Sequence, residues 1–375
     1  MRGLGEFRLE SYLARWEFKA RHNLTASDVE SCSLSQLLEL ASAEQRAQWD
    51  ELSLGYLPSE GSSLLREAIA ATYEGLQSDQ LLCFSGAQEG LYCALQALLS
   101  PGDHVLVTVP NYQSMEEIPR QLCQQVEALP LLPERDWSFD PEALERRMRP
   151  NTRLVAVNFP NNPTGALPTP EEWDHLIECC RRRGIWLFSD EVYRGLERDP
   201  ARRLPQAAEV YERGLSLNVL SKAYGLPGLR VGWIACPQRE LLSRMLKLKH
   251  YLSICNAGPS EFLASLALRH GTRLLARNRA LVEANLGVLE AFFGRHADRF
   301  DWSAPPGGCV AFPAYLGGDV EGWCQRLVED HGLLFLPASI YRSPLACIPE
   351  NRFRVGFGRR SLSQGLTALE QVLSG

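Results

Sequence analysis

Several features that would assign a protein to a membrane, a secretion route or a nucleic acid are missing from this sequence. Its hydrophobic runs stay below the ~18–20 residues that a helix needs to cross a bilayer. The N-terminal stretch MRGLGEFRLESYLARWEF is charged and has no apolar signal core, so we expect a cytoplasmic protein. The formal net charge of −6 gives no reason to expect nucleic acid or an anionic membrane as a partner.

Cysteine pairs at metal-binding spacing are missing too. The eleven cysteines include no CxxC pair, and most stand in apolar contexts, so we predict no metal site. Reduced thiols in a cytoplasm are the expected state. The histidines are scattered, and the sequence has neither an internal repeat nor a low-complexity tract.

What the sequence does contain is an alternation of apolar strands and helices. Hydrophobic residues make up 45% of the 375 residues, enough for two domains or for one large domain with a satellite. The alternation predicts an α/β fold with a mostly parallel sheet. Apolar strands are expected near residues 83–85, 104–109, 154–159, 185–190, 215–220 and 231–235.

Beyond about residue 259 the pattern changes. Long helices are expected at 260–269 and 274–295, followed by short strands near 309–315 and 333–336. Towards the N-terminus, residues 33–50 and 62–76 are also predicted to be helical. We interpret the C-terminal part as a smaller domain joined by an N-terminal arm.

Lys222 lies at the centre of the stretch NVLSKAYGLPGLRVGW, residues 218–233. An apolar strand runs into it and a Gly-rich bend follows. A lysine at the lip of a buried strand loses hydration, which disfavours the ammonium and frees the amine as a nucleophile. By itself such a lysine would be interpreted as a surface residue in a turn. The motifs elsewhere in the chain are therefore needed to distinguish the two interpretations.

Four motifs in order carry a resemblance to a known family. They are NFPNNPTG at 158–165, SDEVYRGL at 189–196, the Lys222 stretch, and FRVGFG at 353–358. The chain resembles the fold-type I pyridoxal-phosphate (PLP) enzymes of the class I/II aminotransferase branch, from about Gly55 to Phe357. The family's serine three residues before the lysine is replaced here by Val219.

The resemblance implies the PLP-dependent transferase type I fold. This is an α/β fold in which a large domain, residues 46–258, has a mostly parallel, seven-stranded-type sheet. A smaller α+β domain covers residues 259–375, and residues 1–45 form the N-terminal arm and part of the small domain.

The resemblance also implies how PLP is held at its ring. Lys222 would carry PLP as an internal aldimine and act as the catalytic residue. Asp190 would pair with the pyridine nitrogen, which keeps the ring an electron sink. Asn162 and Tyr193 would reach the ring oxygen. Tyr112 would stack on the ring, or else serve as a packing tyrosine.

At the phosphate end, the resemblance implies a second group of ligands. The amides of Ala87 and Gln88 open a helix, and free amides at a helix N-terminus bind anions. Ser221 and Arg230 complete the group, and the guanidinium of Arg230 is suited to phosphate oxygens. Tyr56 is at the position whose hydroxyl crosses to the PLP of the other subunit, so a homodimer with shared sites is expected.

For the substrate, Arg354 is at the position that docks the α-carboxylate, beside Asn162. Ser27 and Asp28 replace the Gly-x-Pro loop of most relatives. They are either substrate contacts or an ordinary helix N-cap. If Asp28 lines the pocket unpaired, a cationic side chain such as a guanidinium is favoured. Three neighbouring arginines are interpreted as surface charge: Arg352, Arg359 and Arg360.

The function that follows first is a PLP-dependent aminotransferase of an α-amino acid. The alternative is a cyclase of hydroxylated arginine, because the Lys222 stretch resembles that of capreomycidine synthase-like members, which also lack the Gly-x-Pro loop. A non-catalytic PLP-sensing regulator is disfavoured by the acidic charge and by the lack of a basic DNA-binding extension. The expected partner is a small amino acid.

Overall fold

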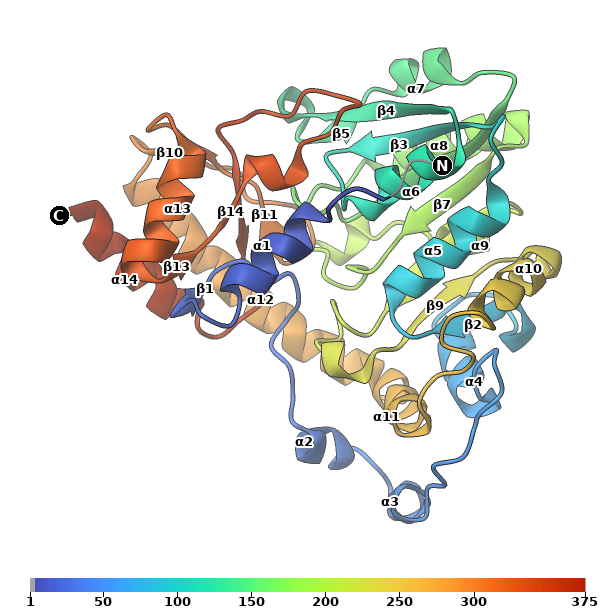
Figure 1. Ribbon diagram of the computed structural model, residues 1–375. Helices are drawn as coiled ribbons and strands as arrows, with labels where there is room; N and C mark the ends of the chain where they lie inside the picture. Colours follow the sequence, from blue (N-terminus) through green and yellow to red (C-terminus); the bar gives the residue numbers. More distant parts are fainter. Residues whose placement is uncertain (1–3, 375) are drawn as a thin grey trace.

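Eight strands form one sheet in the order β2-β9-β8-β7-β6-β3-β4-β5 in the computed structural model, which describes residues 4–374 (Figure 1). The pairs among β3, β4, β6, β7 and β8 are parallel, whereas β9, β2 and β5 are antiparallel to their neighbours. The strands are β2 (Leu81–Phe84), β3 (His104–Val109), β4 (Gln125–Leu132), β5 (Ser138–Phe139), β6 (Thr152–Asn158), β7 (Trp186–Asp190), β8 (Gly214–Val219) and β9 (Gly232–Ala235).

The mostly parallel α/β sheet expected from the sequence is therefore confirmed. It has one strand more than the seven-stranded type, because the two-residue β5 pairs with the edge of β4. Every residue of β3 and β8 is buried, as expected for parallel strands covered by helices on both faces.

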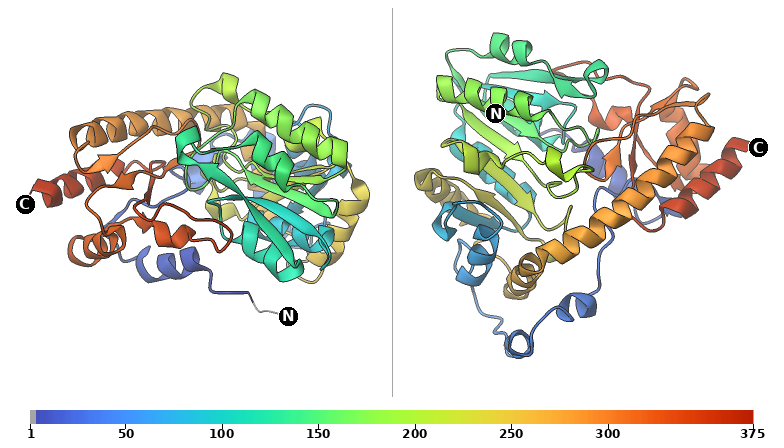
Figure 2. Two further views of the ribbon diagram at one scale, coloured as in Figure 1. Left: turned by 90° about the horizontal axis from the view of Figure 1, so that it is seen from above. Right: turned by 180° about the vertical axis from the view of Figure 1, so that it is seen from behind.

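Helices cover the two faces of this sheet in separate groups (Figure 2). One face packs against α5 (Ala87–Leu98), α6 (Ser114–Leu122) and α10 (Arg239–Lys249). The other packs against α7 (Pro141–Arg147), α8 (Pro170–Arg183) and α9 (Ala207–Val210). At the β2–β9 end that second face is covered by α4 (Ser63–Ala70) and α11 (Gly258–Arg269).

The C-terminal part is built on short strands around an aromatic core. Its three-stranded sheet has the order β11-β15-β14, and two-stranded pairs join β1 to β13 and β10 to β12. The rings of Phe300, Trp323 and Phe353 contact one another there. The strands are β1 (His22–Asn23), β10 (Phe300–Asp301), β11 (Val310–Ala311), β12 (Ala314–Tyr315), β13 (Leu333–Leu334), β14 (Leu336–Pro337) and β15 (Phe353–Gly356).

The long helix α12 (Gly271–Arg295) runs from the large sheet to this smaller part, as both views in Figure 2 show. Helices α13 (Val320–His331) and α14 (Leu362–Ser374) complete it. The strands of the large sheet all lie within 46–258, but the domain boundaries themselves stay a prediction. Short 3₁₀ helices are η1 (Ser78–Gln80), η2 (Pro133–Arg135), η3 (Pro200–Arg202), η4 (Pro227–Leu229) and η5 (Ala338–Tyr341).

The N-terminal arm differs from the sequence prediction in one respect. Instead of one helix over 33–50 there are two, α2 (Leu34–Leu38) and α3 (Ala43–Asp50). Ser33 and Ser42 each form a capping box with a glutamine three residues on, so a second helix begins at Ser42. Before them, α1 (Arg8–Trp16) packs near η5, and α4 ends at Ala70 rather than at residue 76. Within residues 4–374, no helix combines the length and the apolar character needed for a bilayer crossing.

Candidate active site

A cavity of about 490 Å³ lies at the carboxyl ends of β6, β7 and β8. Its walls come from the large sheet, from β15 in the smaller part, and from α1. This edge of a parallel sheet is where ligands bind in open α/β folds, and the volume is in the range of small-molecule sites. All but one of the predicted site residues line it; the exception is Tyr56.

The register of the parallel strands brings Asn158 and Asp190 together. The two residues end β6 and β7 and are paired across the strands. Asn158 Nδ2 donates to the backbone oxygen of Asp190 at 3.0 Å, and its Oδ1 accepts from the amide of Asn162 at 2.7 Å. The following turn is thereby fixed, and Asn162 is directed at the cavity.

Asp190 is a buried carboxylate with little to stabilise its charge. It accepts one hydrogen bond, from the Val192 amide at 3.2 Å. Burial raises the pKa of Asp190 to about 6, against the opposing effects of the Val192 amide and the Lys222 charge. A cationic group in the cavity beside Asp190 would restore its ionised form.

Lys222 is held at the cavity by the loop after β8. Gly225 has φ +68°, and a Cβ there would come within 3.0 Å of the backbone oxygens of Val29 and Glu30. The bend therefore packs directly on the N-terminal arm. This contact places Ser27 next to the lysine, whose Nζ donates to Ser27 Oγ at 2.8 Å.

The environment of Lys222 lowers the pKa of its amine and so shifts the group towards its neutral form. Burial is the largest effect lowering its pKa, and the nearby Arg354 charge acts in the same direction, while Asp28 and Asp190 oppose it. A neutral amine is the form that can attack a carbonyl carbon or accept a proton.

At the other end of the cavity, the start of α5 faces Arg230. Gly86 precedes the helix with φ +95°, and a Cβ on it would lie 2.6 Å from Arg230 Nη2. A Cβ on Gly232 would likewise lie 2.7 Å from the Ala87 amide nitrogen. Because neither glycine has a Cβ, Arg230 can approach the start of α5, and β9 can pack against the backbone amide of Ala87. Ser221 borders the same region, as does Val219, which offers no hydroxyl.

Arg354 enters the cavity from β15 and is almost fully buried, with 1% of its surface exposed. Its Nη1 donates to Asn162 Oδ1 at 2.9 Å and its Nη2 to the Thr25 oxygen at 2.6 Å. Tyr341 also donates to Asn162 Oδ1, at 3.3 Å. The Nε of Arg354 has no partner among the described residues.

Two tyrosines complete the walls. The hydroxyl of Tyr193 is buried and has no hydrogen bond of normal geometry among the described residues. Burial raises the pKa of Tyr193, and the nearby Ser27 side chain opposes this rise. Tyr112 packs on Phe7 with 5.1 Å between ring centroids and donates to Glu10 Oε1 at 3.2 Å.

The structure overturns two interpretations of the N-terminal loop. No helix begins at Ser27 or Asp28, so the N-cap reading is wrong. Arg359 is not a surface charge, because its Nη2 is 2.7 Å from Asp28 Oδ2 and both residues line the cavity. Asp28 does lie in the pocket, but it is already paired, which removes the argument for a cationic substrate from an unpaired Asp28. Arg352 is also largely covered, and it donates to the Phe312 oxygen, whereas Arg360 is exposed.

Helix α1 and its C-cap residue line the cavity and supply two acidic groups that were not predicted from the sequence. Glu10 and Glu17 line the pocket together with Leu9 and Leu13. The two glutamates are seven residues apart, which is two helical turns, so they share a face. The seven-residue spacing could have predicted that the two glutamates share a helix face, but it does not show which part of the molecule that face contacts.

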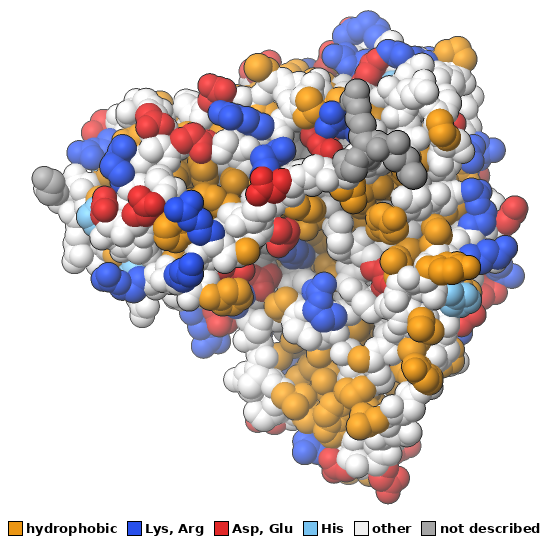
Figure 3. Space-filling view, viewed as in Figure 1, with side chains coloured by type: hydrophobic (Ala, Val, Ile, Leu, Met, Phe, Trp, Pro, Cys, Tyr) orange, Lys and Arg blue, Asp and Glu red, His pale blue; other side chains and the backbone are white. Residues whose placement is uncertain are grey.

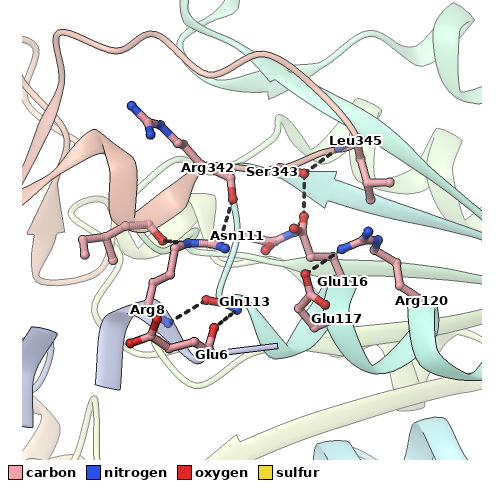
Figure 4. A network of polar contacts seen from close by, with 11 residues as sticks. Glu6, Arg8, Asn111, Gln113, Glu116, Glu117, Arg120, Arg342, Ser343 and Leu345 are labelled. Carbon is pink, nitrogen blue, oxygen red and sulfur yellow. Dashed lines mark hydrogen bonds and ion pairs between the residues drawn. The ribbon is translucent and has the colours of Figure 1, made fainter. Parts of the chain in front are cut away.

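A network of polar contacts fastens this helix to both parts of the molecule (Figure 4). The Arg8 amide donates to Gln113 Oε1 at 3.0 Å, and Gln113 Nε2 donates to the Glu6 oxygen at 2.8 Å. On the other side, Arg8 Nε donates to the Ile340 oxygen at 3.3 Å, and Nη2 to that of Arg342. Gln113 follows the cavity residue Tyr112, so the network positions α1 over the site.

The family of this chain follows from a comparison with known families. The family model for aminotransferase class I and II matches residues 22–367. The chain belongs to this family. Its members are PLP-dependent aminotransferases, or lyases and cyclases on the same fold, and PLP is the cofactor.

Several relatives are similar along nearly the whole chain. Capreomycidine synthase of Streptomyces vinaceus is 31% identical over 369 residues, which cover 97% of this chain and 93% of that protein. A PLP-dependent aminotransferase structure from Streptococcus suis has a TM-score of 0.92 at 29% identity, covering 100% and 98% of the two chains. The PLP-dependent cyclase OrfR has a TM-score of 0.90 at 30% identity, with the same coverage.

The residues of the cavity fit PLP. The glycine-lined amides of α5 and Arg230 suit a phosphate, and the buried Asp190 carboxylate suits a protonated ring nitrogen. The Tyr193 hydroxyl, for which the described residues offer no hydrogen bond of normal geometry, and the side-chain amide nitrogen of Asn162 suit the ring oxygen. Lys222 is the amine that would hold the cofactor covalently.

Replacing Gly86 by Ala tests the phosphate end. The new methyl group would meet Arg230 Nη2 at 2.6 Å in a backbone conformation with φ +95°. We expect PLP to dissociate at least about tenfold more readily, since losing even ~1.4 kcal/mol of binding has that effect. The measurement is the bound cofactor's absorbance during dilution or dialysis. Gly228→Ala, in the same region but with open space around it, is the matched control; equal retention by the two variants would contradict this reading.

Proposed function

We propose that this enzyme acts on an α-amino acid with a guanidinium or similar cationic side chain, and that its reaction is the dehydrating cyclisation of a hydroxylated arginine. The proposed substrate class, an amino acid with a cationic side chain, rests on the acidic face of α1 at the cavity. Similarity to capreomycidine synthase along almost the full length of both chains supports the reaction.

Glu17 is the carboxylate best suited to a cationic side chain. Its side chain lines the cavity and forms neither a hydrogen bond nor an ion pair with any residue in the range 4–374, whereas Asp28 is paired with Arg359. Burial and the negative charges of Asp28 and Glu10 raise the pKa of Glu17, against the effects of Arg359 and Lys222. A cation bound there would relieve both the burial and the repulsion.

Glu10 lines the same cavity, next to Tyr112. Its Oε1 accepts from Tyr112, so it links α1 to the residue proposed to stack on the PLP ring. The side chain is exposed, and its second oxygen is free to share a bidentate guanidinium with Glu17. The space-filling view shows acidic side chains where α1 crosses between the two parts of the molecule (Figure 3).

The substrate's other end has its own contacts. Arg354 would bind the α-carboxylate through its buried guanidinium, whose orientation Asn162 and Thr25 fix. Carboxylate and side-chain charge would then be held at two ends of the cavity, with the α-carbon between them near Lys222.

The proton transfers follow from the position of Lys222. Its neutral Nζ would accept the proton from the α-carbon, while Ser27 Oγ orients it. PLP, when bound, accepts the electron pair left at that carbon. A β-hydroxyl then leaves with a proton as water, and Lys222 Nζ is placed to return one. A guanidino nitrogen closes the ring on the β-carbon and releases its own proton, so the net loss is one water.

Transamination is the second candidate. The structure from Streptococcus suis, which is described as an aminotransferase, is as similar to this chain as the cyclase OrfR. The same residues serve both reactions up to the loss of the α-proton, and only transamination needs a 2-oxo acid as acceptor.

The two reactions are separated by incubating the holoenzyme with 3-hydroxyarginine without any 2-oxo acid. We expect sustained turnover to a product one water lighter, detected by mass spectrometry. Borohydride reduction should fix the cofactor to Lys222, and Lys222→Ala should give neither product nor reducible attachment. Turnover that stops after one equivalent and resumes on adding pyruvate would establish transamination instead.

A substitution in α1 tests the substrate class. Glu17→Gln removes the charge with little change in shape. The kcat/KM for 3-hydroxyarginine should therefore fall about 10–100-fold, from the ~1.5–3 kcal/mol of a hydrogen bond to a charged group. Any slow turnover of aspartate should be unchanged. The control is Glu44→Gln, an exposed glutamate on α3. A Glu17→Gln variant that keeps the wild-type kcat/KM for 3-hydroxyarginine would rule out this role.

We further propose a homodimer that shares its sites. Tyr56 is 92% exposed and does not line the cavity of its own chain, and Leu54 and Tyr251 are 85% and 91% exposed. Hydrophobic side chains gather on the surface over the region of α2, α4 and α11 (Figure 3). A twofold partner is the commonest way to cover such a surface.

Light scattering tests this assembly. The wild type should have the mass of two chains, and Leu54→Asp should shift it towards one chain by placing a charge in the contact. Tyr56→Phe should remain dimeric but hold PLP more weakly, since the hydroxyl is the group proposed to reach the neighbouring phosphate. A wild-type enzyme that is monomeric and fully active would exclude shared sites.

A further inference from the structure

Three metal-ligating side chains of different kinds meet on the outer surface of α7 and α8, away from the cavity. Glu145 comes from α7, and His175 and Cys179 come from α8. The histidine and the cysteine are four residues apart, so they lie on one helical face. None of the three lines the cavity around Lys222.

The donor atoms form a nearly equilateral triangle. His175 Nε2 is 3.2 Å from Glu145 Oε1 and 3.3 Å from Cys179 Sγ, and Sγ is 3.4 Å from the same Oε1. The centre of such a triangle is about 1.9 Å from each corner, which is the mean side divided by the square root of three. An ion slightly above the plane would therefore have bonds near the usual ~2.0 Å for nitrogen and oxygen and ~2.3 Å for sulfur.

The triangle is accessible from solvent. The side chains of His175 and Glu145 are 37% and 39% exposed, while Cys179 lies beneath them and is buried. An ion would enter from the open side, bind the imidazole and the carboxylate, and keep a position for water.

Both ends of the supporting helix α8 are fixed by capping residues. Thr169 caps the start of α8 and forms a capping box with Glu172, and Gly184 ends the helix in a left-handed conformation. His175 and Cys179 are thus on a rigid element, and α7 packs against it. Rigid donors favour a defined coordination geometry.

Arg182 now competes for the same atoms. Its Nη2 is 3.3 Å from Glu145 Oε1 and 3.4 Å from Cys179 Sγ, above one edge of the triangle. The side chain is 56% exposed, so it can turn out into water. Removing its charge should make the three donors more available to a cation.

We propose that Glu145, His175 and Cys179 form a zinc site with three protein ligands and an open fourth position. One imidazole, one thiolate and one carboxylate are a donor set that zinc accepts, and the thiolate disfavours the harder Mg²⁺ and Ca²⁺. No metal site was expected from the sequence, because the cysteines have no CxxC spacing. Here the third ligand comes from another helix, 30 residues earlier than the histidine.

The test uses the dimer-competent holoenzyme, stripped with a chelator and titrated with Zn²⁺ by calorimetry. We expect one ion per chain and, at the zinc X-ray absorption edge, one sulfur ligand. His175→Gln and Glu145→Gln should weaken binding more than about tenfold, and Cys179→Ser should remove the sulfur signal, because each deletes a ligand. Arg182→Gln should bind zinc more tightly than the wild type.

Two variants control for adventitious binding: Cys347→Ser, which removes an exposed thiol, and His250→Gln, which removes an exposed imidazole elsewhere. Both should bind zinc as the wild type does. Because His175 and Glu145 are partly exposed, their variants are expected to fold even if Cys179→Ser does not. Zinc that still binds with wild-type affinity in His175→Gln, or a site lost in Cys347→Ser, would overturn the proposal.

Discussion

The charged side chains buried at the carboxyl edge of the parallel sheet determine which other groups the cavity must contain. Asp190, Lys222 and Arg354 are all drawn out of water into one cavity, and the low dielectric pushes Asp190 and Lys222 towards their neutral forms. Such groups are stable only where opposite charges or hydrogen bonds meet them. The cavity supplies some of these, through Ser27 and Asn162, and the remainder fits the ring nitrogen and phosphate of PLP.

The same constraint explains why three distant segments converge. The strand register sets Asn158 beside Asp190, the bend at Gly225 packs on residues 29 and 30, and the neighbouring Ser27 is thereby brought to Lys222. Helix α1 then closes the site, fastened through Gln113 to the large sheet and through Ile340 to the smaller part. The carboxylates of Glu10 and Glu17 thereby become part of the cavity wall.

The sequence predicted the parts of the site that local motifs specify. The structure brings five residues that each stand in a short motif to one cavity: Lys222, Asp190, Asn162, Arg230 and Arg354. Pairings made by tertiary packing were out of reach. Arg359 was interpreted as surface charge and Asp28 as either a substrate contact or a helix N-cap, yet the two form an ion pair. Glu17 and the triangle around His175 were missed for the same reason, since no local pattern shows what a helix face meets.

In the proposed function, α1 selects a positively charged side chain. Arginine and citrulline have nearly the same shape, but citrulline carries a neutral ureido group in place of the guanidinium. The most direct measurement is the dissociation constant of each amino acid, from the absorbance change of bound PLP on titration of the wild-type holoenzyme. The account predicts that arginine binds at least about tenfold more tightly, a difference of ~1.4 kcal/mol. Equal dissociation constants for the two amino acids would contradict it.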